Sequence, residues 1–403
     1  MEEQRIEKLI TNLKSTGRPK LEEQRTVAHI EGRPDLFETK VLHRKVSDPE
    51  FRVLVGSRDP GSAAALAPVL DELENADLFL LTDGRAEEAF RKNLNLDDVT
   101  PEDGPLATAE IVGQPDILLM DISSGEMGID TYLDATFDDI PKVLVEDYYT
   151  TAIKFLRKLK ERDLPFPEKI CVMDQGAKEI VVEEFPDLES RIVVTGQPAF
   201  DKFAKEDTQA IGLGVKEKLG LRPEDKLVSF MSTMDEPEKI EHMAKSLQPF
   251  ADQFCFVFRR HPRDNTSYET FKNILTSKGI RVLDTDTFTT DQISAASDVV
   301  ITTWSTEGLS AIYRGKPTIH LVDSRFRITE GIRTPLVPVK LGASVGIENA
   351  DEVGEALAKF LQGDTVIMEE LRANMERYYS ADGNNAKRVA DVVRELVEAT
   401  KIK

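Results

Sequence analysis

Three stretches of this chain place phosphate-binding types of side chain directly after apolar runs. They read MSTMD at 231–235, RRHPR at 259–263 and TWSTEG at 303–308. Hydroxyl groups and backbone amides at the start of a helix hold phosphate, because the positive end of the helix dipole lies there. Arginine adds a planar fork that matches phosphate oxygens. If the apolar runs are parallel strands, their carboxyl ends share one edge of a sheet, where such folds bind ligands.

These stretches predict one anion site to which all three strand ends contribute. The candidate contacts are Ser232, Arg259, Arg260, His261, Ser305, Thr306 and Glu307. Some have a structural alternative, since Ser305 is well placed to cap a helix and Arg260 or Arg263 could pair with surface carboxylates. Three arginines between 259 and 263 are informative in a chain whose net charge is −21. The set as a whole therefore favours an anion site.

Short apolar runs separated by helical patterns predict two α/β domains with parallel, doubly wound sheets. The expected strands are 51–57, 76–82, 116–121, 142–147, 169–174 and 191–196, then 226–233, 254–262, 280–286, 298–303 and 316–323. We expect a helical arm over 1–50, a first Rossmann-like domain over 51–203, a second over 204–380, and a last helix over 381–403 that packs back across the domains.

The composition is typical of a soluble, cytoplasmic protein. The 403 residues include 73 acidic and 52 basic side chains, and this negative charge disfavours binding to nucleic acid or anionic membranes. No apolar run approaches the ~20 residues that a membrane helix needs, and the amino terminus lacks the apolar core of a signal peptide. Cys171 and Cys255 lie in apolar runs, as buried free thiols do. The histidines show no metal-ligand spacing, and Asp284-Thr285-Asp286 reads as an acidic loop, so no metal is expected.

Several motifs together resemble the GT-B group of nucleotide-sugar glycosyltransferases. They are VVTGQPAFDKF at 193–203, RRHPRD at 259–264 and DVVITTWSTEGLSAIYRGKP at 298–317. UDP-N-acetylglucosamine 2-epimerases, lipid-A-disaccharide synthases and CDP-glycerol glycerophosphotransferases share this layout. The spacing from Trp304-Ser305-Thr306 to Gly315-Lys316-Pro317 is also similar to an element of the CDP-glycerol enzymes. This chain departs from the epimerases at Gly308-Leu309, where they carry adjacent carboxylates, and from the glycerophosphotransferases at Ser310, where they carry an aspartate.

The resemblance implies a GT-B-like fold in which two Rossmann-like domains face an interdomain cleft. It implies a metal-independent transferase, without a cofactor, that moves a sugar from a nucleotide-diphosphate donor such as a UDP-sugar to the hydroxyl of an unidentified acceptor. Ser305 and Thr306 would bind the diphosphate, with Arg260 and His261 at the donor and Glu307 able to meet a ribose hydroxyl. The alternatives are a UDP-N-acetylglucosamine 2-epimerase, a CDP-glycerol-type phosphotransferase and a non-catalytic nucleotide-binding protein. A homo-oligomer is compatible with each of them.

The first domain would then hold the acceptor and the general base. VGSRDPGS at 55–62 is a strand, a turn and a helix start that resembles the acceptor loop of these enzymes, and Gly56 and Gly61 allow close backbone approach. Arg58 is a candidate anion contact. Asp59 is the first candidate for the base, although it could equally cap the helix, and Glu146 is the second. The catalytic candidates are thus Asp59, Glu146 and His261.

Overall fold

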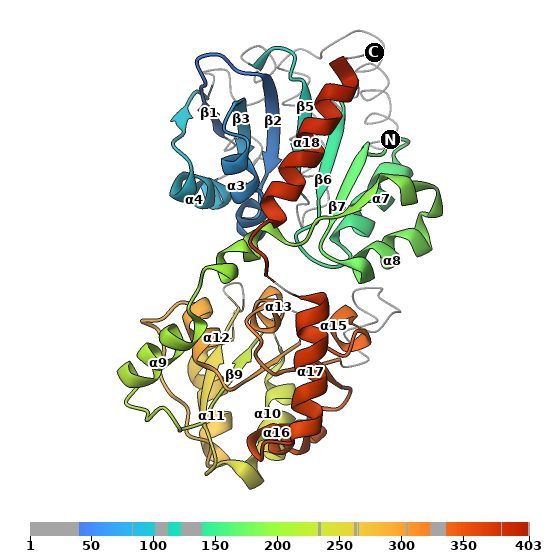
Figure 1. Cartoon of the computed structure of the whole chain (residues 1–403). Helices are drawn as coiled ribbons and strands as arrows, with labels where there is room; N and C mark the ends of the chain where they lie inside the picture. The colour runs from blue at the N-terminus through green and yellow to red at the C-terminus, as the bar shows by residue number, and fades with distance from the viewer. Residues whose placement is uncertain are drawn as a thin grey trace, which may run out of the picture. The chain divides into compact units, whose positions relative to one another are not determined.

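A computed structural model describes residues 40–82, 84–100, 112–121, 139–232, 235–261, 264, 266–303, 305–322, 336–379 and 381–401. The chain forms two compact units, each a sheet with helices on its faces (Figure 1). Unit 1 contains the chain up to Asp201 and the segment from Gly383 onward. Unit 2 runs from Lys202 to Asp382. No helix among the described residues is long and apolar enough to cross a membrane.

Within its described residues, unit 1 is built on an eight-stranded sheet in the order β4-β1-β3-β2-β5-β6-β7-β8. From β3 to β8 the neighbouring strands are parallel, whereas β1 runs antiparallel to both β3 and β4. The strands are β1 (Lys40–Arg44), β2 (Phe51–Ser57), β3 (Ala76–Thr82), β4 (Asp97–Asp98), β5 (Ile117–Met120), β6 (Lys142–Val145), β7 (Lys169–Val172) and β8 (Ile192–Val194). The inner strands are continuous apolar runs because helices cover both faces of the sheet.

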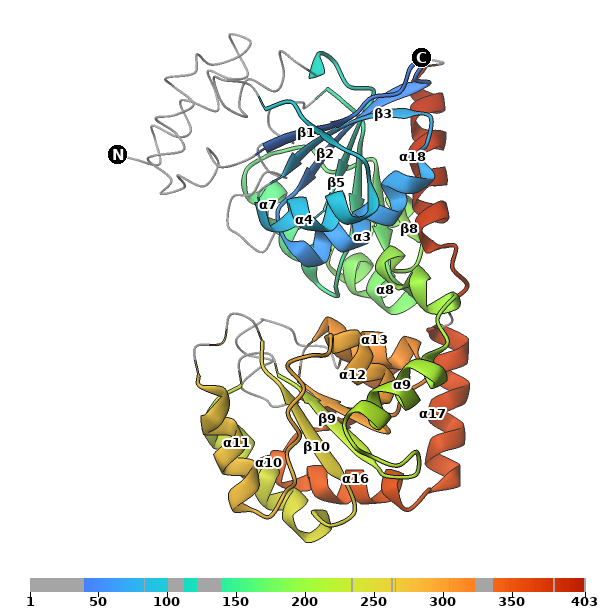
Figure 2. The same ribbon diagram turned by 90° about the vertical axis from the view of Figure 1, so that its left-hand side faces the viewer.

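The helices of unit 1 include one from the far end of the chain. They are α3 (Pro60–Glu72), α4 (Gly84–Asn93), α7 (Thr151–Glu161), α8 (Gln175–Glu184) and α18 (Asn385–Lys401). Helix α18 packs against α3, and Val389, Val393 and Val397 on its buried face join the core of the sheet (Figures 1 and 2).

The TGQPAFD segment at 195–201 anchors the start of α18. Both carboxylate oxygens of Asp201 accept backbone N–H groups, from Asn385 at 3.0 Å and Ala386 at 2.8 Å, so Asp201 caps the helix from a distant part of the chain. Gly196 has φ +87°, and a Cβ there would lie 1.9 Å from Asn385 Oδ1. Only glycine permits this approach, and the Gln197 carbonyl completes the contact by accepting from Asn385 Nδ2 at 3.0 Å. This motif therefore has a structural task in unit 1.

Unit 2 is built on a five-stranded sheet in the order β10-β9-β11-β12-β13, and all neighbours are parallel. Its strands are β9 (Leu227–Met231), β10 (Cys255–Arg259), β11 (Val299–Thr302), β12 (Thr318–Leu321) and β13 (Val345–Ile347). Its helices are α9 (Thr208–Lys218), α10 (Pro237–Leu247), α11 (Tyr268–Ser277), α12 (Thr290–Ala296), α13 (Thr306–Tyr313), α15 (Val337–Lys340), α16 (Val353–Leu361) and α17 (Thr365–Tyr378).

The structure confirms the α/β class with two parallel-rich sheets and corrects two details. A helical arm does not continue to residue 50, because 40–44 form β1, whose Val41 and Leu42 are buried against β3. The rest of that arm lies outside the described residues. Residues 280–286 do not form a strand: only Val282 bridges to Phe256, at the outer side of β10, where no further strand extends the ladder.

Candidate functional site

The carboxyl edge of the unit 2 sheet brings together the ends of β9, β10 and β11. Met231 is in register with both Arg259 and Thr302, so the residues that follow these positions emerge side by side. The Ser232 amide donates to the Arg259 carbonyl at 2.9 Å, which continues the ladder past the strand ends. Thr302 Oγ1 donates to the Met231 carbonyl at 2.8 Å. The sheet thus fixes the backbone from which the candidate side chains project.

A buried carboxylate, Asp235, ties two of these strand ends together. Its Oδ2 accepts from Ser232 Oγ at 3.0 Å and from Thr303 Oγ1 at 3.3 Å, and its Oδ1 pairs with Lys239 Nζ at 3.0 Å. Ser232, Thr303 and Asp235 are all nearly inaccessible to solvent. Ser232 is therefore used to hold the loop after β9. The chain carries no motif that would mark Asp235 for this role, and the pairing became visible only in the fold.

Ser305 is the N-cap of α13, and its Oγ accepts the backbone N–H of Glu307 at 3.2 Å. Thr306 is the exposed first residue of that helix. The helix can lie this close to the sheet because residue 308 is glycine: a Cβ there would meet Thr302 Cγ2 at 2.5 Å. The amino terminus of α13, with its positive dipole end, is thereby held against the carboxyl end of β11. Trp304 lies outside the described residues.

The two arginines at the end of β10 differ in their surroundings. Arg259 is half-buried, and its Nη1 donates to the Thr285 carbonyl at 3.1 Å. Arg260 is exposed, and its Nη1 donates to the carbonyls of Asp264 at 2.8 Å and Thr266 at 2.7 Å, so it braces its own loop. Its neighbour in the loop, His261, is half-buried, and Arg263 lies outside the described residues.

Glu307, in the first turn of α13, combines burial with an unsatisfied oxygen. Its Oε2 is buried and has no hydrogen-bond partner among the residues that the structure describes. Burial raises the pKa of Glu307 to about 7, and the negative charge of Asp291 raises it further. The positive charges of Lys202, Arg314 and Arg259 oppose that shift. Glu307 thus offers an acceptor at the carboxyl edge that the protein itself leaves unpaired, as expected of a group that meets a ligand hydroxyl.

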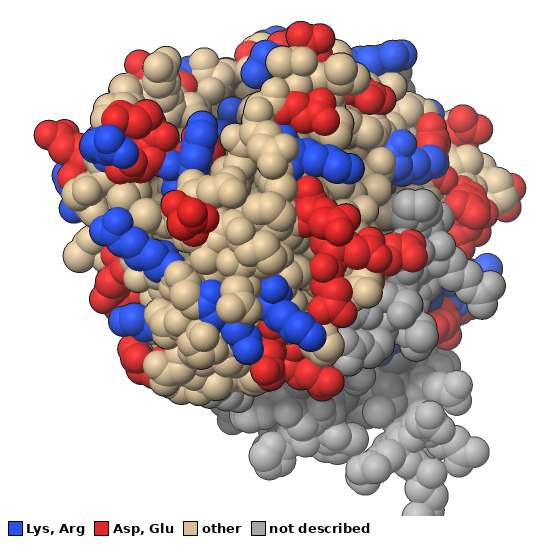
Figure 3. Space-filling model, turned by 90° about the horizontal axis from the view of Figure 1, so that it is seen from below, with Lys and Arg blue, Asp and Glu red and all other residues tan. Residues whose placement is uncertain are grey.

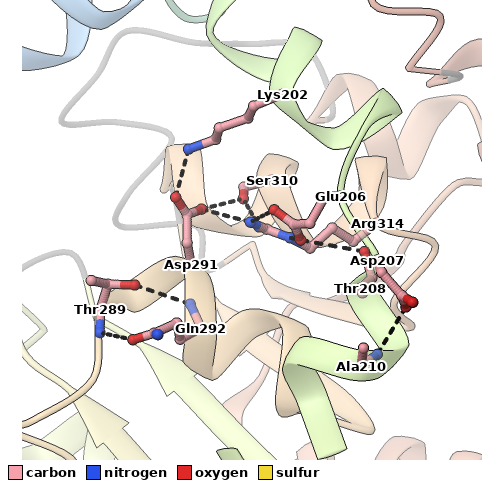
Figure 4. A network of polar contacts seen from close by, with 10 residues as sticks. All are labelled: Lys202, Glu206, Asp207, Thr208, Ala210, Thr289, Asp291, Gln292, Ser310 and Arg314. Carbon is pink, nitrogen blue, oxygen red and sulfur yellow. Dashed lines mark hydrogen bonds and ion pairs between the residues drawn. The ribbon is translucent and has the colours of Figure 1, made fainter. Parts of the chain in front are cut away.

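Beneath Glu307, Arg314 organises a network of buried charges (Figure 4). Its side chain is 1% exposed and pairs with Glu206 at 2.7 Å and Asp291 at 2.9 Å. Lys202 pairs with the same Asp291 at 2.5 Å. Two cations and two carboxylates are thereby balanced, and α12, α13 and the segment before α9 are fixed to one another. Arg314 is 108 positions from Glu206 and Lys202 is 89 positions from Asp291, so only the fold reveals these pairs.

In unit 1, Asp147 comes two residues after β6, and its side chain contacts the first turn of α3, next to the predicted acceptor loop. Its Oδ2 accepts from the buried Ser62 Oγ at 3.0 Å, and its Oδ1 accepts from Thr151 Oγ1 at 2.9 Å. Burial raises the pKa of Asp147, these two hydrogen bonds lower it, and the negative charge of Asp59 adds a small rise. Asp59 is half-buried at the N-cap position of α3, yet its side chain makes no capping hydrogen bond. Arg58 is half-buried beside it, while Gly56 is buried at the end of β2 and Gly61 is exposed.

Glu146 follows β6 and is 1% exposed, and within the described part of the chain neither of its carboxylate oxygens has a hydrogen-bond partner. Burial, then the negative charges of Asp174 and Asp147, raise the pKa of Glu146 well above its usual range. The amides of Ala152 and Met173 oppose this rise in part, without reaching hydrogen-bond geometry. Asp174 caps α8 by accepting from the Ala177 amide at 2.8 Å. Burial thus disfavours the ionised form of Glu146, which is the form that a general base needs.

A family model described as CDP-Glycerol:Poly(glycerophosphate) glycerophosphotransferase matches residues 138–395, well over half of the chain. The chain belongs to this family. It is one of the relatives that the motifs indicate, and it corresponds to the phosphotransferase alternative rather than to sugar transfer. The family is a transferase family that acts on a nucleotide-activated donor. No curated protein matches the chain.

Several solved structures share the fold at low sequence identity. The UDP-GlcNAc 2-epimerase from Neisseria meningitidis, bound to UDP-GlcNAc, matches with a TM-score of 0.61 and 15% identity over 85% of this chain and 100% of that one. A glycosyltransferase from Rickettsia africae matches with a TM-score of 0.56 and 12% identity over 86% and 98%. The wall teichoic acid polymerase TagF, soaked with CDPG, matches with a TM-score of 0.53 and 12% identity over 99% and 98%. These likenesses confirm the GT-B-like fold.

Proposed function

We propose that this chain transfers a glycerol phosphate group, or a closely related polyol phosphate, from a CDP-linked donor to an acceptor hydroxyl. The observation that carries this proposal is the family match over residues 138–395, which includes the whole of unit 2. The likeness to TagF supports the same donor class, because that structure was soaked with CDPG. The carboxyl edge of unit 2 adds a helix amino terminus and an arginine suited to a phosphorylated donor.

The proposed reaction is a displacement at phosphorus. The acceptor oxygen forms a bond to the phosphorus that carries glycerol, and the bond from that phosphorus to the bridging oxygen breaks. CMP leaves with the bridging oxygen, and a base on the enzyme takes the acceptor proton. Charge then develops on the transferred phosphoryl oxygens and on the leaving phosphate, so positioned positive groups lower the barrier.

Unit 2 supplies the donor contacts in this account. The amide groups at the start of α13 and the Thr306 hydroxyl face the diphosphate, and Ser305 keeps the helix start in place through its cap. Arg259 adds positive charge, and Glu307 accepts a hydrogen bond from a ribose hydroxyl through its unpaired Oε2. Arg260 and His261 hold the neighbouring loop, and Ser232 acts through Asp235 to position the turn after β9.

Unit 1 supplies the acceptor contacts and the base. Asp59 is the proposed base, since it is half-buried at the start of α3 and its side chain does not cap that helix. Arg58 lies next to it in the loop, and Gly56 and Gly61 flank the pair in sequence. Glu146 is the second candidate, because burial and the charges of Asp174 and Asp147 raise its pKa and so disfavour its ionised form.

The nucleotide product distinguishes this function from sugar transfer. Glycerophosphate transfer releases a nucleoside monophosphate, whereas glycosyl transfer releases a nucleoside diphosphate. The full chain is incubated with CDP-glycerol or with UDP-N-acetylglucosamine, each with a glycerol phosphate oligomer as acceptor, and the nucleotides are separated by anion-exchange chromatography. Acceptor-dependent CMP from CDP-glycerol supports the proposal. UDP release from the sugar donor, with no CMP from CDP-glycerol, contradicts it.

A further inference from the structure

Unit 2 has a cavity at the edge of its sheet opposite to the donor site. The cavity has a volume of about 490 Å³, within the range of small-molecule sites. Lys226 directly precedes β9, Asp298 directly precedes β11 and Pro317 directly precedes β12, and all three line it. The cavity therefore opens at the amino ends of β9, β11 and β12, and the carboxyl ends of β9 and β11 lead to Ser232 and Thr306. The proposed donor site does not include it.

The charges that line this cavity are mostly positive. Lys216, Lys226, Arg314, Lys316 and Arg372 contribute cations, and Asp298 contributes the one carboxylate of the lining. Arg314 is already balanced by Glu206 and Asp291 in the network described above. The others share a single negative charge within the lining, in a chain whose net charge is −21.

Two of these cations, Lys216 and Lys226, pair with groups of the protein itself. Lys216 donates to Asp298 Oδ2 at 2.8 Å and to the carbonyls of Pro223 and Asp225 at 3.3 and 2.9 Å. Lys226 pairs with Asp298 Oδ1 at 3.3 Å. Helices of an α/β unit point their carboxyl ends towards this edge, and lysines commonly neutralise the carbonyls there. Lys216 fits that structural role.

Lys316 and Arg372 do not have that structural role. Among the described residues, neither side chain has a hydrogen bond or an ion pair, although Lys316 is partly buried. Burial lowers the pKa of Lys316, Asp298 opposes that shift, and the nearby positive charges of Lys216 and Arg314 lower it further. The charge of Lys316 is thus only partly compensated, so an anion bound beside it would lower the cost of its burial, whereas Arg372 is exposed and has no such cost.

The same cavity has an apolar wall. Leu213, Phe360, Leu361 and Met368 line it, and Leu213 is 42% exposed although it is a large apolar side chain. Charged side chains of both signs alternate on the face of the molecule drawn in Figure 3, without a broad basic field. A local basic pocket with an apolar wall fits a small phosphorylated molecule better than a nucleic acid.

We propose that this cavity is a second anion site, which binds the phosphate group of a small phosphate ester through Lys316 and Arg372 and packs the apolar part of that ester against Leu213 and Met368. The site lies one strand length, about 15 Å, from the donor edge. It does not depend on the proposed function, because it uses none of the donor contacts.

Equilibrium dialysis with radiolabelled inorganic pyrophosphate tests the site in the full chain. The donor edge is first disabled by Ser305→Ala with Thr306→Val, and Lys316→Met with Arg372→Met is then added to that background. We expect the background chain to bind pyrophosphate and the added pair to weaken binding at least tenfold. Lys218→Met is the matched control, since Lys218 is exposed on α9 and does not line the cavity. This control should leave binding unchanged.

Two further readouts keep the result clear. Lys316→Met should melt no lower than the background, because it removes an unpaired, partly buried charge, so lost binding cannot be assigned to unfolding. A second arm replaces pyrophosphate with phosphatidylglycerol vesicles and measures co-flotation. Binding that depends on Lys316 in either arm supports the phosphate site, and the arm that responds identifies a soluble ester or a lipid headgroup as its source. Binding in neither arm, or binding that the added pair does not weaken, overturns the proposal.

Discussion

Replacing Glu307 with glutamine tests whether the protein holds an energetically costly carboxylate for its ligand. The pKa of Glu307 is raised from 4.5 to about 7. Between these two values the folded chain binds more protons than the unfolded chain, so the free energy of unfolding falls as pH rises through that window. A shift of this size corresponds to about 3 kcal/mol at pH 8. Because the side chain keeps some contact with solvent, we expect about 1–3 kcal/mol.

Glu307→Gln removes that cost while nearly preserving the shape of the side chain. The variant should therefore be more stable than the parent chain by about 1–3 kcal/mol at pH 8, and by less than about 0.5 kcal/mol near pH 4.5, where the parent carboxyl is protonated in the folded chain and about half protonated in the unfolded chain. The same variant should bind the CDP-linked donor at least tenfold more weakly, because a ribose hydroxyl then loses a charged acceptor worth about 1.5–3 kcal/mol.

The assay is urea unfolding at pH 4.5 and pH 8, followed by the fluorescence of Trp304, the only tryptophan of the chain and three positions before Glu307. Glu217→Gln is the matched control, since Glu217 is exposed on α9, and it should change neither stability nor donor binding. Equal stability of Glu307→Gln and the parent at pH 8, or an equal gain at both pH values, would refute the reasoning from burial.

Three other substitutions or treatments give direct checks on the structure. Gly308→Ala should destabilise unit 2 by about 1–3 kcal/mol in urea unfolding, because its Cβ would meet Thr302 Cγ2 at 2.5 Å. Gly214→Ala is the control: no atom lies within 4 Å of its Cβ, so it should stabilise α9 by up to about 1 kcal/mol. Equal effects of the two substitutions would contradict the packing of α13. Arg314→Ala should cost about 3–5 kcal/mol by the same measurement, because it leaves the Glu206 carboxylate without its cation and Asp291 with Lys202 alone, and a loss below about 1 kcal/mol would show that the network does not hold unit 2. Burial raises the pKa of Cys171 to about 12, so iodoacetamide at pH 8 should label it only after denaturation, as mass spectrometry of the native chain would show.

The positions of the strands can be predicted from the sequence where the strands are buried on both faces. The runs at 51–57 and 76–82 coincide with β2 and β3, since an inner parallel strand is apolar at nearly every position. At the edges this signal fails. The antiparallel β1 has only Val41 and Leu42 buried, and the apolar pair Val282–Leu283 bridges to β10 through one residue without forming a strand.

The sequence predicts those residues of the site that lie near the ends of recognisable strands. Ser232, Arg259 and Ser305 are recognisable because Arg259 ends a strand that the apolar pattern marks and the two serines follow such strands within three residues. Asp235 and Arg314 were missed, because what they do depends on partners far away in the chain. Thr303 is 68 positions from Asp235, and Glu206 is 108 positions from Arg314. No local pattern records such pairings, whereas the register of parallel strands creates them.

The position of the transferred phosphorus tests the central claim most directly. CDP-glycerol labelled with ³³P in the phosphate that carries glycerol is incubated with the full chain and a glycerol phosphate oligomer, and the oligomer is separated from free nucleotides. The account predicts that the label moves to the oligomer together with the glycerol, that unlabelled CMP is released in equal amount, and that Asp59→Asn slows the transfer at least a hundredfold. Label that stays with the nucleotide while the acceptor is modified, or no transfer from CDP-glycerol at all, would contradict it.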